Sequence, residues 1–297
     1  MGHHHHHHDH TTGNIKTAFF LNFFFTIIEL IGGILTNSMA IISDALHDLG
    51  DSLSLGLAWF LQNFSKKEKS KQFSFGYKRF SLLAALINSV VLIVGSIFIL
   101  TEAVPRLLDP QEPHTLGMMG LAVLGILVNG AAVFKLRGGS SMNQKVITWH
   151  LLEDVLGWVA VLIVSIVMTF AELPILDPIA SIFITLYILY NVILNLVKTM
   201  RLFLEAVPEN INLDEIINTI QQLPDVKSTH HTHLWSLDGE HHAFSTHVVV
   251  PASSSKEAVC NIKEQVKQVI EDIHLDHITI EIEYEDEYCS MNEEKGG

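Results

Sequence analysis

The chain has 297 residues, 48% of them hydrophobic, and its two cysteines, Cys260 and Cys289, exclude a disulfide framework. The formal net charge of −14 comes from the segment after Leu204, which holds 19 acidic and 5 basic residues, whereas the preceding two-thirds is neutral and apolar. Such an acidic segment disfavours nucleic acid as a partner and favours cations. The asymmetry predicts two parts, one apolar and one soluble.

The N-terminus carries a histidine run, His3 to His8. A purification tag and a native metal-scavenging tail both fit this run, and we place no site in residues 1–14. The first apolar run lacks the short core and cleavage site of a signal peptide.

Six apolar segments are long enough to cross a bilayer, for which a helix needs about 20 residues. The predicted spans are 15–35, 39–61, 80–100, 116–136, 146–170 and 175–197. Single amides inside them, at Asn22, Asn88 and Asn129, are expected to hydrogen-bond between helices.

The orientation follows from the basic residues near the span ends. Twelve lysines and arginines flank the spans on one side, and Arg106 alone lies on the other. We therefore expect a multi-pass protein of the inner (plasma) membrane with both termini in the cytoplasm. Asp177-Pro178 predicts the start of the sixth span, with the carboxylate at or beside the cap.

After residue 204 the pattern changes to that of a small α+β domain in the order α-β-β-α-β, over residues 205–290, followed by a tail at 291–297. A helix is predicted at 213–223 and another from Ser253–Ser255 to about 273. Strands are predicted at 229–237, 243–250 and 277–283, the last because it alternates strictly. Its small core favours dimerisation. The fold class is thus an α-helical membrane protein of six transmembrane helices (15–204) with this cytoplasmic domain.

The second and fifth predicted spans each contain a histidine and an aspartate, which are costly to place inside a membrane. His47 and Asp51 are four residues apart, as are His150 and Asp154, so each pair lies on one helix face. Two imidazoles and two carboxylates suit a divalent ion of the zinc type. The alternative is a structural polar network, but two unrelated spans rarely share such a pattern by chance.

The same groups suggest proton coupling. Without metal, His47 and His150 can hold protons, and metal competes for the same lone pairs. An alternately opening site would then move metal outward and protons inward. Asp44 and Asp48 form another pair, which suits an entry path or polar packing.

These residues resemble the signature positions of the cation diffusion facilitator family. The resemblance rests on the stretch from Ser43 to Asp51, on Phe75-Gly76-Tyr77-Lys78-Arg79-Phe80, on His150 with Asp154, and on Asp177-Pro178. It covers nearly the whole chain and implies a homodimeric antiporter that exports zinc, and also cobalt or cadmium, in exchange for protons. The loop 62–76 has no histidine or aspartate, and its lysines suit anionic lipid headgroups.

The acidic domain holds eight histidines. By resemblance, His230, His247, Glu281 and Glu283 fall at ligand positions of a zinc site that senses metal, and Cys260 stands where some relatives have histidine. The alternative is a solvated polar face. Cys289 is a weak further candidate.

Three other functions are alternatives to export. A non-transporting metal receptor or regulatory subunit of the same architecture would not need the intramembrane quartet. A metalloprotease requires His-Glu-x-x-His, which is absent, so no enzyme is expected. A channel needs several weak binding sites in series so that the ion can leave, whereas four ligands at one site would bind it tightly.

Overall fold

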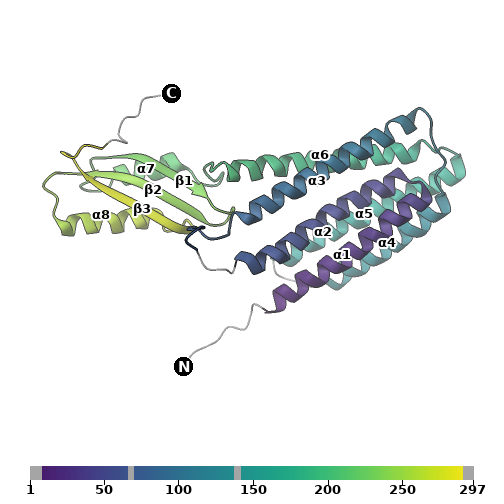
Figure 1. The fold of residues 1–297 in the computed structure, drawn as a ribbon, viewed down its shortest axis with the longest axis horizontal. Helices are drawn as coiled ribbons and strands as arrows, with labels where there is room; N and C mark the ends of the chain where they lie inside the picture. Colours follow the sequence, from purple (N-terminus) through teal and green to yellow (C-terminus); the bar gives the residue numbers. More distant parts are fainter. Residues whose placement is uncertain (1–8, 66–69, 137–141, 290–297) are drawn as a thin grey trace. The chain divides into compact units, whose positions relative to one another are not determined.

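The computed structural model describes the backbone of residues 9–65, 70–136 and 142–289. The elements form two compact units, residues 1–66 with 84–196 and residues 67–83 with 197–297 (Figure 1).

Six long helices form the apolar part of the chain. They are α1 (Asp9–Thr36), α2 (Met39–Ser65), α3 (Phe80–Ala103), α4 (Thr115–Leu136), α5 (Met142–Ala171) and α6 (Leu176–Phe203), with a short 3-10 helix at Pro105–Leu107. Five of them are long and apolar enough to cross a membrane, and α2 is the one that does not meet this criterion. The exception carries Asp44, Asp48 and Asp51. All six predicted spans are therefore helices, and the chain is a multi-pass membrane protein.

Asp177 does more than begin its own helix. It lies in the first turn of α6, as predicted, but its 2% exposed carboxylate caps the start of α2 instead. It accepts hydrogen bonds from Ser38 Oγ at 2.6 Å and from the backbone N–H groups of Met39 at 2.7 Å and Ala40 at 3.2 Å. These N–H groups have no partner within their own helix, so the contact satisfies them and ties α6 to α2.

Two of the three predicted amide contacts between helices are present. Asn22 of α1 donates to the Asp48 carbonyl and to Ser52 Oγ of α2, both at 3.1 Å, and Asn88 of α3 donates to Ser54 Oγ of α2 at 2.8 Å. The third prediction is wrong for the amide nitrogen of Asn129, which has no hydrogen-bond partner among the described residues.

The acidic part has the predicted α-β-β-α-β order: α7 (Leu213–Gln221), β1 (Ser228–Ser236), β2 (His242–Val250), α8 (Lys256–Val269) and β3 (Leu275–Tyr284). The sheet order is β1-β2-β3, with β1 antiparallel and β3 parallel to β2. Apolar residues of both helices pack against Leu234, Phe244, Val248 and Val250 on one face of the sheet.

The last strand departs from the simple alternation expected of it. Ile278 is 38% exposed, whereas Glu283 is only 7% exposed. Glu283 is buried because its carboxylate contacts His247, as described below.

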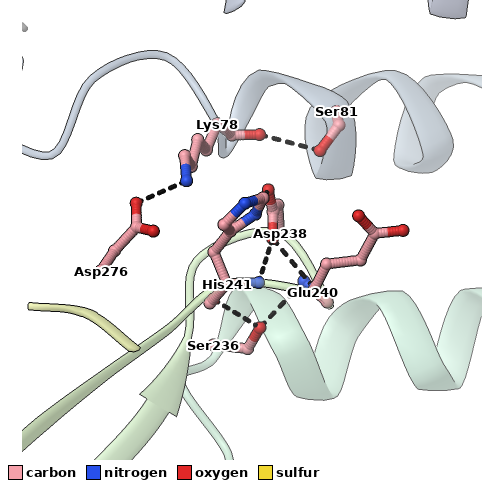
Figure 2. A network of polar contacts seen from close by, with 8 residues as sticks. Lys78, Ser81, Ser236, Asp238, Glu240, His241 and Asp276 are labelled. Carbon is pink, nitrogen blue, oxygen red and sulfur yellow. Dashed lines mark hydrogen bonds and ion pairs between the residues drawn. The ribbon is translucent and has the colours of Figure 1, made fainter. Parts of the chain in front are cut away.

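The second unit includes the loop before α3. Lys78 forms an ion pair with Asp276 at the start of β3, and the ring of Phe75 stands edge-on to His277 at 5.4 Å. Figure 2 shows the Lys78 contact. Lys78 thus pairs with a carboxylate of the same unit.

Candidate metal centres

The membrane-embedded candidate begins with His47 and Asp51 on α2. One helical turn separates them, and His47 Nε2 lies 3.6 Å from Asp51 Oδ2. Each side chain is 27% exposed. An imidazole and a carboxylate at this separation can both reach one divalent ion.

A cavity of about 400 Å³ joins α2 to α5 and α6. His47 and Asp44 line it from α2, and Asp154 lines it from α5. Asp44 Oδ1 also approaches Gly157 of α5: a Cβ atom added to this glycine would lie 3.6 Å from that oxygen. The structure therefore brings His47 and Asp154 to one space, as the repeated spacing predicts. His150 lies on α5, but its side chain is outside the described residues.

Sequence reasoning missed Glu29 of α1. Its side chain is 1% exposed, and no N–H or hydroxyl group of the described residues donates to either of its oxygens. Its ionisable neighbours are Asp48, Asp44 and Asp154. A glutamate inside the first predicted span was the available signal, because ionisable groups at membrane depth are usually functional.

The second candidate lies on the sheet of the acidic domain. Strand pairing sets His230 of β1 opposite His247 of β2, and the parallel β3 brings Glu283 beside them. His247 Nδ1 lies 2.6 Å from Glu283 Oε1, and His230 Nε2 lies 3.3 Å from Glu283 Oε2. All three residues are less than 9% exposed.

Cys289 completes this group from the turn after β3. Its Sγ lies 3.4 Å from His230 Nε2 and 3.7 Å from His247 Nδ1. One ligand atom from each of the four residues lies within 4.8 Å of the others, and no other such group occurs among the described residues. Two imidazoles, a carboxylate and a thiolate are the ligand types of tetrahedral zinc.

The electrostatics favour a cation at this position. Burial alone would raise the pKa of Glu283, but hydrogen bonds from Cys289 and His247 and the nearby His230 hold it below the ordinary value of 4.5. The carboxylate is therefore ionised at neutral pH and available as a ligand. His230 Nδ1 is buried without a hydrogen-bond partner among the described residues.

Two residues singled out in the sequence lie outside the group. Glu281 has a 60% exposed side chain, and its Oε2 lies 3.4 Å from Nε2 of His247, the ring nitrogen on the other side from Glu283. A carboxylate there orients a metal-binding histidine without touching the metal. Cys260 is exposed on α8.

Comparison with known proteins covers both units. The family profile described as the cation efflux transmembrane domain matches residues 15–204, and the one described as the cation efflux protein cytoplasmic domain matches residues 208–285.

Curated relatives match over most of their length. The chain is 33% identical over 296 residues to the cadmium, cobalt and zinc/H(+)-K(+) antiporter of Bacillus subtilis, covering 96% of this chain and 93% of that protein. It is 34% identical over 280 residues to the metal cation efflux system protein CzcD of Cupriavidus metallidurans, with 92% and 88% coverage. It is 30% identical over 281 residues to the zinc transporter ZitB of Escherichia coli, again with 92% and 88% coverage. Matches of this extent, together with the helices and the strand order of the two units, establish that the chain belongs to the cation diffusion facilitator, or cation efflux, family.

Proposed function

We propose that this protein exports a divalent transition-metal ion, zinc foremost and also cobalt and cadmium, from the cytoplasm in exchange for protons. The observation that carries the proposal is the shared cavity of His47 and Asp154, with Asp51 one turn from His47. The three relatives named above are called antiporter, efflux protein and zinc transporter, which supports export of metal. The family consists of transporters, and we propose no enzymatic step.

His47, Asp51, His150 and Asp154 would hold the transported ion. A buried carboxylate is costly without a counter-ion, and a dication relieves that cost. When the ion leaves, the imidazoles take up protons because metal and proton compete for the same nitrogen lone pairs. Movement of α2 against α5 would open the cavity to one side of the membrane at a time.

Zinc uptake into proteoliposomes, measured with an internal fluorescent indicator, tests the exchange. An outward-directed proton gradient should drive uptake, and His150→Ala should abolish it. A parallel arm imposes a potassium gradient, because the Bacillus relative is named for both counter-ions. Uptake that persists unchanged after the proton gradient collapses would refute the coupling.

We further propose that His230, His247, Glu283 and Cys289 bind a regulatory zinc ion in the acidic domain, with Glu281 supporting His247. The sequence proposed Glu281 as a direct ligand, and the position of Cys289 within the group supports the thiol in its place. Zinc binding there would favour one transport state by linkage.

We place the protein in the inner (plasma) membrane as a homodimer with both termini and the acidic domain in the cytoplasm. The charge bias of the loops supports this orientation. The second candidate, a non-transporting receptor, would keep the zinc site of the acidic domain and lose the membrane quartet. Zinc binding without zinc flux in the proteoliposomes would favour it.

A further inference from the structure

His242 interrupts the apolar face of the sheet in the acidic domain. On β2 the side chains of Phe244 and Val248 point into the core formed with α7 and α8. His242, at the start of the same strand, is 6% exposed, and its Nδ1 has no hydrogen-bond partner among the described residues. Burying a polar atom without a hydrogen-bond partner costs free energy, and a bound ligand at His242 Nδ1 would remove that cost.

A cavity of about 800 Å³ adjoins this imidazole. The N-terminal half of α7, the end of α8 and the turn between β1 and β2 enclose it. Three histidines line it, His241, His242 and His274. The last two are joined through the backbone, since the N–H of His242 donates to the His274 carbonyl at 2.9 Å. Neighbouring chain segments thus bring the three imidazoles to one opening.

The turn that carries His241 is held in place by Asp238. Asp238 Oδ1 accepts hydrogen bonds from the backbone N–H groups of Glu240 at 2.9 Å and His241 at 2.8 Å. Its other oxygen lies 2.8 Å from His241 Nδ1 (Figure 2). A carboxylate on Nδ1 directs Nε2 outward as a lone-pair donor, which is how histidines are commonly set for metal binding.

The charge of the cavity selects the class of ligand. Glu215, Glu240 and Asp272 line it, and none of the lysines and arginines that the structure describes does. An anion would meet three carboxylates there without a fixed counter-charge, whereas a cation is attracted. Imidazole nitrogens narrow the class to divalent transition metals, because calcium and magnesium prefer oxygen ligands.

We propose that this cavity is a second metal site of the acidic domain, which binds an exchangeable divalent ion of the zinc type through His242, His274 and His241. The three ligand atoms stand farther apart than the 4.8 Å of the group at His230. His274 is exposed, so its ring can turn toward the buried His242 at little cost, whereas Asp238 holds the ring of His241 with Nε2 available to the ion. Water would complete the shell, which makes this site weaker and faster to exchange than the four-ligand site.

The two sites of the domain are separate. His242 and His247 are five residues apart on β2, about 16 Å at the usual rise of a strand. His242 lies on the face covered by α7 and α8, and His247 contacts residues of the open face. The proposal therefore goes beyond the transport and sensing roles above and does not depend on either.

Zinc stoichiometry of the full-length protein tests the inference. The purified, metal-stripped chain is dialysed against rising zinc, and bound zinc is counted for the parent, His274→Gln and His277→Gln. All three proteins carry the same N-terminal histidine run, so differences between them report on the acidic domain. His277 is exposed on β3 and does not line the cavity, which makes it the matched control. We expect one zinc fewer per chain for His274→Gln and no change for His277→Gln. Equal stoichiometry and affinity in all three would overturn the proposal.

Histidine acylation followed by mass spectrometry keeps the test independent of any folding defect, because it uses the unmutated chain. Zinc should slow modification of His241 and His274 at least about fivefold and leave His277 unaffected. The same protection should persist in Cys289→Ser, in which the other site is weakened. Modification rates of His241 and His274 that do not respond to zinc would contradict the assignment.

Discussion

The contact between α6 and α2 allows the sharpest structural prediction. Asp177→Ala removes an almost fully buried carboxylate and leaves Ser38 Oγ and two backbone N–H groups without their acceptor. Each hydrogen bond to a charged group contributes about 1.5–3 kcal/mol, and removal of one buried partner strands the others. Because the three donors share one acceptor, the contributions overlap, and we expect a total loss of about 3–5 kcal/mol.

Thermal unfolding in detergent, followed by intrinsic fluorescence, measures this loss. For a unit of this size, 1 kcal/mol corresponds to about 2–4 °C, so Tm should fall by about 6–20 °C. Asp177→Asn retains one acceptor oxygen and should fall by less than half as much. Asp109→Ala, an exposed aspartate of the loop before α4, is the control and should not change. A Tm for Asp177→Ala within 2 °C of the parent would refute the capping argument.

Three further predictions concern single side chains. Glu29→Gln removes a buried carboxyl that faces Asp48, so it should raise thermal stability by about 1–2 kcal/mol and lower the zinc transport rate; a variant that loses stability would contradict the burial argument. Cys289→Ser should weaken zinc binding by the acidic domain at least about tenfold, which lowers the zinc-induced stabilisation by about 1.4 kcal/mol at saturating metal; an unchanged Tm shift would remove the thiol from the site. Asp238→Asn should cost about 1–3 kcal/mol at pH 7. Burial would raise the pKa of Asp238, but the hydrogen bonds from His241 and Glu240 hold it below 3.8, so its stabilisation is present above pH 3.8 and is lost as the pH falls below that value. Urea unfolding at pH 7 and pH 3 should show a smaller difference between the parent and Asp238→Asn at the lower pH, and a difference that is the same at both pH values would exclude this origin.

The elements of the fold followed from local patterns. Runs of about 20 apolar residues predicted six helices, and turn signals such as Asp238-Gly239 predicted the breaks in the acidic domain. Ser255, expected to cap α8, does so by accepting a hydrogen bond from the Ala258 N–H at 3.2 Å. Periodicity and capping act over a few residues, so a single sequence contains the information they need.

Contacts between distant segments were harder to predict. Asp177 was correctly expected near a helix start, but its cap belongs to a helix 138 residues away in the chain. Glu281 and Glu283 both fit a ligand position on β3, and only their distances in the structure separate them. Glu283 lies in the group with His230 and Cys289, whereas Glu281 lies beside the opposite ring nitrogen of His247. Strand alternation gives the face of a side chain, whereas the choice of ligand depends on tertiary distances that no spacing rule contains.

The central claim is that α2 and α5 together enclose the transported ion. Initial zinc uptake by proteoliposomes under a fixed proton gradient tests it most directly, for alanine variants of His47, Asp51 and Asp154 against Glu102→Ala. Glu102 is an exposed carboxylate of α3 that does not line the cavity, which makes it the control. Loss of a metal ligand or its support typically costs 10–100-fold, so we expect at least about a tenfold drop for each ligand variant and a near-normal rate for Glu102→Ala. Equal rates in all four variants would contradict the account.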